Sequence, residues 1–250
     1  MDGADTARIA GVARLAAQLM LAGGAETYRA EETARRICGA FGYSADVVAF
    51  PTGLMLSLGE EKSLIARVER RRVDFAVIDR VNAISRELAA GALPLPAAES
   101  ELRELAGRPP MGALRLSAIA AGSSAMFALM FGGAPKDLAA AGAAAFLAQA
   151  ALGRLRQGAA MPLVDLVGGF LTALAAHALG AALGLDAALV VISALMPMLP
   201  GLAMTNAIRD AMRGDLVSGV ARAGEALIRA VVLAVGAGLA VSVWMALWGA

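Results

Sequence analysis

The chain contains 250 residues, 59% of them hydrophobic, and carries a formal net charge of +1 at pH 7. This hydrophobic content indicates a membrane protein, and the near-neutral charge excludes the basic surface that nucleic-acid binding requires. Residues 1–110 hold 29 of the 43 charged residues, so we expect a polar domain over 1–110 and an apolar domain over 111–250. Arg108-Pro109-Pro110 marks the boundary, because consecutive prolines disfavour a helix.

The polar domain is predicted to have an α+β fold. Apolar residues recur at helical spacing in its first 41 residues, with a break at Gly23-Gly24. Three short β-type runs follow, at 47–50, 54–58 and 64–70. Asp74 fits the N-cap of a longer helix that ends at Gly91, and a short amphipathic helix over 97–106 leads to the apolar domain. Cys38 is the only cysteine, so no disulfide can form within the chain.

A polar group follows the Gly23-Gly24 break and faces the predicted turn at 51–53. Its members are Glu26, Tyr28, Arg29, Glu31 and, from the turn, Thr52. One interpretation is a solvated helix start whose acidic residues match the helix dipole. The alternative is a membrane-tethered hydrolase that uses Glu26 or Glu31 with Thr52. Because the only histidine, His177, lies outside this domain, serine–histidine and cysteine–histidine nucleophiles are excluded in it, and we expect no metal and no cofactor.

Five long apolar runs predict an α-helical membrane domain with about five transmembrane helices. They cover 116–134, 138–153, 166–185, 187–208 and 230–250. A span needs ~20 apolar residues, and because the second run is short and rich in alanine, a four-span arrangement stays open.

The start of the chain shows no signal peptide, so we expect the polar domain to be cytoplasmic. The positive-inside rule agrees, because the predicted inner loops contain arginines and the predicted outer loops contain only Lys136. The inner arginines are Arg154, Arg156, Arg209, Arg213 and Arg222.

The fourth apolar run contains helix breakers near its middle. Pro197, Pro200 and Gly201 predict a kink or a break near the bilayer midplane, because proline removes a backbone donor and obstructs the preceding turn. The freed backbone groups then need protein, water or a solute as partner. A kinked helix with a structural role alone is the other interpretation.

Three blocks carry a resemblance to a known family. They are GGAETYRAEETARRICGAFGYSADVVAFPTGLMLSL, RVNAISREL and PGLAMTNAIRDAMRGDLVSGVARAGEALIRA, in that order. Together they resemble the threonine/serine exporter family, in particular its half-size YjjP-type subunit. The resemblance implies a bacterial inner-membrane exporter, not an enzyme, that works with a second small membrane subunit. It also implies carboxylate substrates: threonine and serine for full-length members, C4-dicarboxylates such as succinate for split systems.

The break predicts a place for a substrate carboxylate. A half-helix that begins at Pro200-Gly201 would direct unpaired N–H groups and its positive dipole end at the carboxylate. Thr205 and Asn206 lie one turn further and would donate hydrogen bonds. Arg209 and Asp210, near the cytoplasmic mouth, would pair with neighbouring charges or form an entry gate. The expected substrate-binding residues are therefore Pro200, Gly201, Thr205, Asn206, Arg209 and Asp210.

Asp165 is the candidate proton carrier, because it lies just inside the third apolar run; the alternative is that it only marks the membrane interface. His177 is ~18 Å further along the same helix, so the two cannot pair directly. Glu225 and Arg229 are four residues apart, which favours a local ion pair. Five helices are too few to enclose a pathway, so we expect a partner subunit or a homo-oligomer.

Overall fold

The computed structural model describes residues 3–58, 62–68, 72–156 and 160–249. The chain divides into two compact units, and each unit combines two separate segments. The first unit is Met1–Pro109 with Leu202–Gly224, and the second is Pro110–Gly201 with Glu225–Ala250. One division falls at the predicted proline boundary. The difference from the prediction is the segment Leu202–Gly224, which groups with the N-terminal residues and not with the apolar helices.

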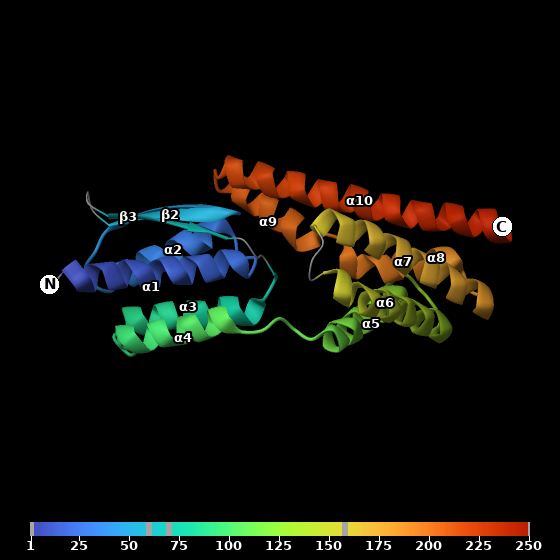
Figure 1. Ribbon diagram of the computed structural model, residues 1–250, viewed down its shortest axis with the longest axis horizontal. Helices are drawn as coiled ribbons and strands as arrows, with labels where there is room; N and C mark the ends of the chain where they lie inside the picture. Colours follow the sequence, from blue (N-terminus) through green and yellow to red (C-terminus); the bar gives the residue numbers. More distant parts are fainter. Residues whose placement is uncertain (1–2, 59–61, 69–71, 157–159, 250) are drawn as a thin grey trace. The chain divides into compact units, whose positions relative to one another are not determined.

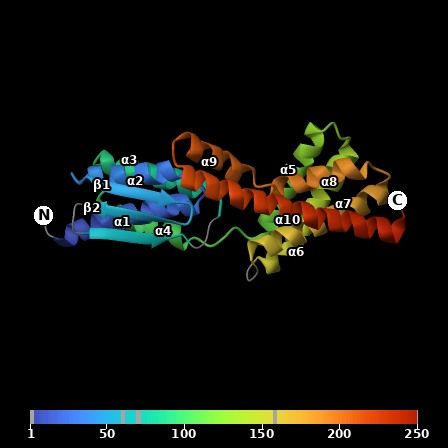
Figure 2. The ribbon, with the colours of Figure 1, turned by 90° about the horizontal axis from the view of Figure 1, so that it is seen from above.

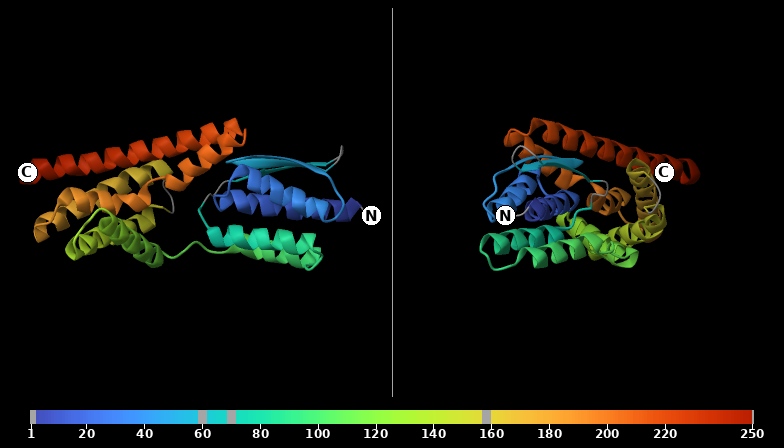
Figure 3. Two further views of the ribbon diagram at one scale, coloured as in Figure 1. Left: turned by 180° about the vertical axis from the view of Figure 1, so that it is seen from behind. Right: turned by 60° about the vertical axis from the view of Figure 1, so that its left-hand side comes forward.

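The first unit has three layers. Its N-terminal elements are α1 (Gly3–Ala22), α2 (Thr27–Gly39), β1 (Ala45–Phe50), β2 (Gly53–Leu58), β3 (Lys62–Arg67), α3 (Phe75–Ala89) and α4 (Leu95–Gly107). The strands form an antiparallel sheet in the order β1-β2-β3 (Figure 2). Helices α1 and α2 lie between this sheet and the pair α3 and α4 (Figures 1 and 3). These elements confirm the predicted helices and strands; residues 69 and 70 of the third predicted run lie outside the described residues.

Alternation along the strands explains why the sheet packs on the helices by one face. Leu54, Leu56 and Leu58 of β2 are buried, whereas Met55 between them is 51% exposed. The register aligns Met55 with Val48 of β1 and Ile65 of β3, so the outward positions of the three strands coincide.

Helix α3 confirms the apolar stripe and the N-cap that the sequence predicted. Its stripe is buried: Val77, Val81, Ile84 and Leu88. The Asp74 side chain accepts a hydrogen bond from the backbone N–H of Val77, 3.2 Å away, which satisfies one of the free donors in the first turn.

The later segment of the first unit forms a helical hairpin. It contains most of α9 (Gly201–Met212) and the first turns of α10 (Leu216–Trp248). Gly214 makes the turn with a φ of 90°, and the Asp215 side chain accepts from the N–H of Ser218 at the start of α10. Gly219 packs so closely that a Cβ there would lie 3.0 Å from the carbonyl oxygen of Ala207. The buried residues of α9 are Asn206, Ala207 and Asp210, so its packed face is largely polar.

The second unit is a helical bundle with an alanine-rich core. It contains α5 (Ala113–Met130), α6 (Pro135–Leu155), α7 (Met161–Leu183), α8 (Ala187–Leu195), the 3-10 turn η1 (Met196–Met198) and the remainder of α10. Helices α7 and α10 touch backbone to backbone: a Cβ on Gly169 would lie 2.3 Å from the Leu233 carbonyl oxygen, and one on Gly236 would lie 2.1 Å from that of Leu166. Small residues let the two backbones approach this closely. In a bilayer such packing, and not the hydrophobic effect, holds helices together.

The described residues support three or four membrane spans. Helices α5, α7 and α10 are long and apolar enough to cross a bilayer, and the pair formed by α8 with η1 and α9 adds a fourth if it is one bent span. The predicted break is present, because α8 ends before the Met196–Met198 turn and α9 begins only at Gly201. The expected count of five is not confirmed. The run at 138–153 forms α6, which is not among these candidates.

Candidate functional site

Two groups of polar side chains lie in the core of the described structure, one in each unit. The first, called here the α9 cluster, consists of Glu26, Thr27, Asn206, Arg209, Asp210, Asp215 and Arg222. The second is the ion pair of Asp165 with Arg229.

The α9 cluster is built around the free N-terminus of α2. Gly24 has a φ of 89° and turns the chain into α2, which leaves the N–H of Thr27 without a helical partner. This N–H donates to Asp210 Oδ1 at 3.3 Å. The Thr27 hydroxyl lies 3.0 Å from the same oxygen and 2.8 Å from Asp215 Oδ2, and its single proton serves one of them at a time. A carboxylate from the α9–α10 hairpin therefore caps α2.

Arg222 supplies the charge that accompanies Asp210 into the interior. Its Nε lies 3.0 Å from Asp210 Oδ2, and the two side chains are 8% and 0% exposed. Its Nη2 donates to the carbonyl oxygen of Ala25 at 2.8 Å. Since a buried carboxylate is costly without a cation and hydrogen bonds, the pair ties the hairpin to the residues before α2.

Glu26 is held as a carboxylate between two arginines. Its Oε1 accepts from Arg209 at 2.8 Å, and its Oε2 lies 3.4 Å from Arg29. Burial is the largest single influence and acts to raise the pKa of Glu26, but its own backbone N–H, Arg209 and Arg29 together lower that pKa below its ordinary value. Beside this pair, the Arg213 guanidinium lies 3.9 Å from the centre of the Tyr28 ring.

The structure joins two groups that the sequence kept apart. Asn206, predicted to donate a hydrogen bond to the substrate, donates to the carbonyl oxygen of Gly24. Arg209 and Asp210, predicted to pair with neighbouring charges or to form an entry gate, contact Glu26 and Thr27. Of the other predicted substrate residues, Thr205 is exposed, and Pro200 and Gly201 lie at the break that closes the 110–201 segment of the second unit.

The arrangement proposed for a hydrolase is not supported. Glu31 accepts from the Ala49 N–H at 3.0 Å and pairs with Arg35, so it serves the start of the sheet. Thr52 is exposed, and its carbonyl oxygen accepts from the N–H of Val68. Both candidate carboxylates are thus paired with arginines, which opposes a role as general acid.

The second unit gives Asp165 a partner that the sequence did not suggest. Arg229 Nε donates to Asp165 Oδ2 at 2.7 Å and Nη2 donates to Oδ1 at 3.1 Å. Spacing favoured Glu225 as a partner of Arg229, and Glu225 does interact with Arg229 electrostatically. Helices α7 and α10 also bring Asp165 to the same guanidinium (Figure 1). The available signal was an ionisable residue inside each of two apolar helices, since such residues in membranes normally find partners.

The opposite end of the α7–α10 contact is aromatic. His177 stacks on Trp244 with 5.9 Å between ring centres, and Trp244 stacks on Trp248 at 4.5 Å. His177 is therefore a packed residue of the bundle.

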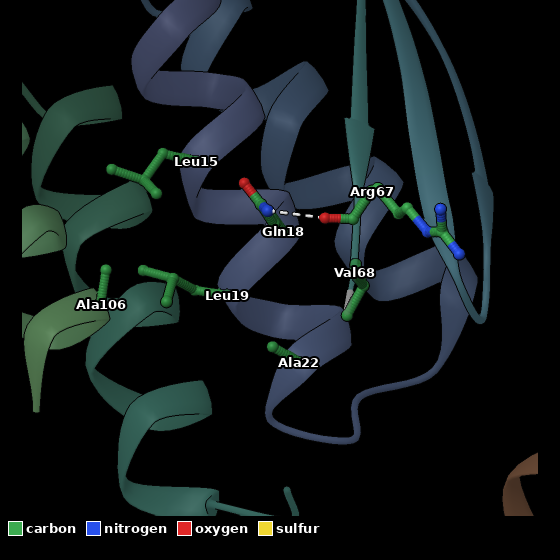
Figure 4. Close-up of a pocket in the computed structure, with 7 residues that line it drawn as sticks. All are labelled: Leu15, Gln18, Leu19, Ala22, Arg67, Val68 and Ala106. Atoms are coloured by element: carbon green, nitrogen blue, oxygen red, sulfur yellow. Dashed lines mark hydrogen bonds between the residues drawn. The ribbon is translucent and has the colours of Figure 1, made fainter. Parts of the chain in front are cut away.

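The first unit also contains an open hollow of about 480 Å³, shown in Figure 4. Its lining is Leu15, Gln18, Leu19, Ala22, Arg67, Val68 and Ala106. Gln18 Nε2 donates to the carbonyl oxygen of Arg67, and the Arg67 guanidinium points away from the hollow (Figure 4). The polar parts of this lining are Gln18 and the Arg67 backbone, and because the guanidinium points away the hollow presents no cation to a carboxylate. Among the described residues, no three His, Cys, Asp or Glu side chains are grouped as a metal site would require.

Comparison with known proteins identifies the family. The model of the family described as "Putative threonine/serine exporter" matches residues 12–244, which include parts of both units. No curated protein and no solved structure matches the chain. Together with the apolar helices, the family match indicates a membrane transport protein. The chain therefore belongs to the threonine/serine exporter family.

Proposed function

We propose that the chain is one subunit of a secondary exporter that moves small carboxylate metabolites out of a bacterial cell together with a second small membrane subunit. The observation that carries the proposal is the family match over residues 12–244, because it covers the polar unit as well as the apolar helices. The substrates are amino acids such as threonine and serine, or C4-dicarboxylates such as succinate. Both classes present a carboxylate, for which arginines and helix N-termini are the usual protein partners.

The polar unit is proposed to lie on the cytoplasmic side of the inner membrane. Arg209, Arg213 and Arg222 belong to the same compact unit as the N-terminal residues. Positive residues next to membrane spans favour the cytoplasmic side, so these three arginines support this orientation for the whole unit.

The need for a second subunit is argued from the number of helices. The described residues provide three spans, or four with the bent pair, and only one broken helix pair was found among them. Inverted-repeat transporters build their central site from two such broken elements. A second membrane protein of the same family would supply the other; a homo-oligomer is the competing arrangement.

The break remains the proposed place of gating. Helix α9 begins at Gly201, and its buried polar face is held by the residues that lead into α2. We propose that the α9 cluster is the gate that Arg209 and Asp210 were expected to form; Pro200, Gly201 and Thr205 stay predicted substrate residues.

Counterflow of labelled solute tests this proposal. Membrane vesicles from the source cells, which contain any partner, are compared with vesicles from cells that lack this chain and with liposomes that hold the purified chain alone. We expect exchange of labelled threonine, serine or succinate only in the first preparation. Equal exchange with and without the chain would overturn the exporter function, and full exchange by the chain alone would replace the partner with a homo-oligomer.

Gly201→Leu tests the break itself. A Cβ at Gly201 would meet no atom within 4 Å, so the larger side chain should leave the fold intact. We expect it to reduce counterflow by filling the space beside the helix start. Gly238→Leu, at another open position, is the matched control. Parental exchange by Gly201→Leu would show that the break has a structural role only.

A further inference from the structure

We propose that the Asp165–Arg229 pair is a carboxylate-binding site, in which Arg229 binds the carboxylate of the transported solute and Asp165 fills that position when the site is empty. The proposal rests on the proposed function for the class of solute. Its evidence comes from the second unit alone.

The geometry of the pair is that of arginine bound to a free carboxylate. Two parallel N–H···O bonds of 2.7 and 3.1 Å join the Arg229 guanidinium to both oxygens of Asp165. A planar guanidinium forms the same fork with any carboxylate that reaches it. A solute carboxylate could therefore replace Asp165 without a change in the number or kind of bonds made by Arg229.

The arginine of the pair is more exposed than the aspartate, as the binding of an external anion requires. The Arg229 side chain is 29% exposed, whereas the Asp165 side chain is 7% exposed. The cation is thus open to an incoming anion, and the internal carboxylate lies behind it.

The neighbouring charges set the balance of the exchange. Arg156, at the end of α6, interacts electrostatically with both Asp165 and Arg229, and Glu225, one turn before Arg229, interacts with Arg229. These four charges sum to zero when the site is empty. An added carboxylate leaves one negative charge in excess, which a proton on the released Asp165 removes. The exchange is then balanced: solute carboxylate and one proton enter, Arg229 changes partner, and Asp165 becomes a neutral carboxyl.

The guanidinium is held in place by the tightest helix contact of this unit. Gly169, one turn after Asp165, lies against the backbone of α10, and Gly236, two turns after Arg229, lies against that of α7. Contacts of this kind leave little freedom for the two helices to move, which fixes the position of a binding group.

The break in the chain reaches the same face of α7. Met198, the last residue of η1, contacts the Thr172 hydroxyl through its sulfur at 3.5 Å, and its Cε occupies the space where a Cβ on Gly168 would lie. Asp165, Gly168 and Thr172 share one face of the helix. A change at the ion pair therefore has a packed neighbour through which it can act on the break.

The position along the helices suits access from water. Asp165 lies 18 residues before the end of α7 at Leu183, about 27 Å at 1.5 Å per residue. Arg229 lies 19 residues before the end of α10 at Trp248, about 28 Å. Both lengths approach the ~30 Å of the hydrocarbon core, so the pair lies near one edge of the apolar stretch and the Trp244 and Trp248 rings near the other.

Calorimetry on the purified full-length chain in detergent tests the site. The probes are succinate and L-threonine, with succinamide and L-threoninamide as controls that lack the carboxylates, at one pH unit either side of neutrality. We expect the parent chain to bind at least one of the acids, neither amide, and to bind more tightly at the lower pH. Arg229→Gln should weaken binding by about tenfold or more, since a charged, two-pronged contact is lost.

Variants of Asp165 separate this role from a structural one. Asp165→Asn removes the internal competitor, so it should bind the acid several-fold more tightly and lose the pH dependence. A structural staple would instead be weakened by either substitution. The exchange variant with Asp165→Arg and Arg229→Asp should recover the thermal stability of the parent but not its binding, because the guanidinium is now at the buried position. Arg80→Gln, which breaks a surface pair with Glu87, is the matched control and should bind like the parent.

The proposal is overturned if the parent binds neither acid, if Arg229→Gln binds like the parent, or if Asp165→Asn binds no more tightly. Counterflow distinguishes this failure from that of the proposed function. If vesicles that contain Arg229→Gln show the parental KM, the pair is not the binding site but the chain is still an exporter. If the predicted binding pattern is seen without any exchange of solute, the pair is a binding site but the chain is not an exporter.

Discussion

Replacing Arg222 by methionine should be among the most damaging single changes in the first unit. The substitution keeps most of the volume but leaves the Asp210 carboxylate buried with no cation at 3.0 Å. At an effective dielectric constant of 20, two unit charges at that distance attract by about 5.5 kcal/mol. Losing one partner of a buried pair typically costs about 3–5 kcal/mol. We therefore expect Arg222→Met to lower the free energy of unfolding by about that amount.

A second substitution, Asp210→Asn, tests whether the buried charge causes this loss of stability. Asp210→Asn in the parent should also destabilise the unit, because it weakens the acceptor of Thr27 and leaves Arg222 unpaired. In the Arg222→Met background the same change removes an uncompensated charge, so it should raise stability. The sign of its effect is therefore expected to invert between the two backgrounds.

Cys38 provides the assay. It is the only cysteine, it is fully buried in α2, and burial raises the pKa of its thiol to about 11. A thiol reagent should therefore label the native chain slowly and the unfolded unit quickly. Labelling rates in increasing urea, with the full chain in detergent, then give the stability of the first unit.

The control is Arg80→Met, which makes the same replacement in a pair whose side chains are 37% and 38% exposed. We expect it to cost less than about 1 kcal/mol, since water screens surface pairs. The reasoning is refuted if Arg222→Met and Arg80→Met shift Cys38 labelling equally, or if Asp210→Asn destabilises both backgrounds.

Three further outcomes are expected. Gly236→Leu should lower stability by about 3 kcal/mol or more and separate α7 from α10, because a Cβ there would lie 2.1 Å from a carbonyl oxygen. Gly238→Leu, the control, has open space around it. Equal thermal stability of the two variants in detergent would contradict this prediction. Asp74→Ala should lower the stability of the first unit by about 1 kcal/mol in the Cys38 assay, through loss of the cap on α3; an unchanged urea midpoint would show that the cap contributes nothing. Glu26 has a lowered pKa, so its contribution to stability is present above its ordinary value of 4.5 and is lost as the pH falls through the lower folded value; Glu26→Gln should flatten that part of the stability profile, and a parental profile would refute the assignment.

Local patterns predicted the elements of the first unit well. The strands, the buried stripe of α3 and the cap at Asp74 each depend on residues a few positions apart, where side-chain periodicity and turn chemistry act. The break near Pro200 was predicted for the same reason, because proline acts on its own turn.

The sequence did not predict which residues far apart in the chain would pair. Asp210 was placed near the cytoplasmic mouth of the fourth apolar run, but no pattern indicated its partner Thr27, which lies 183 residues earlier. Spacing predicted the interaction of Glu225 with Arg229, but it did not indicate that Asp165 on another helix would also bind Arg229. A single sequence shows that a buried charge needs a partner, but the fold alone decides which residue supplies it.

The two-part composition of the first unit bears on how the protein is made. When the ribosome has synthesised the first 110 residues, the start of α2 lacks its cap and its arginine, since Asp210 and Arg222 have not yet been translated. Between the two parts the chain contains α5 and α7, which are long and apolar enough to cross a bilayer. The first unit can therefore be completed only after those helices have been translated. A chain arrested before residue 224 would expose an unfinished α2 to chaperones and proteases, so quality control of the first unit would also report whether the intervening helices had been made.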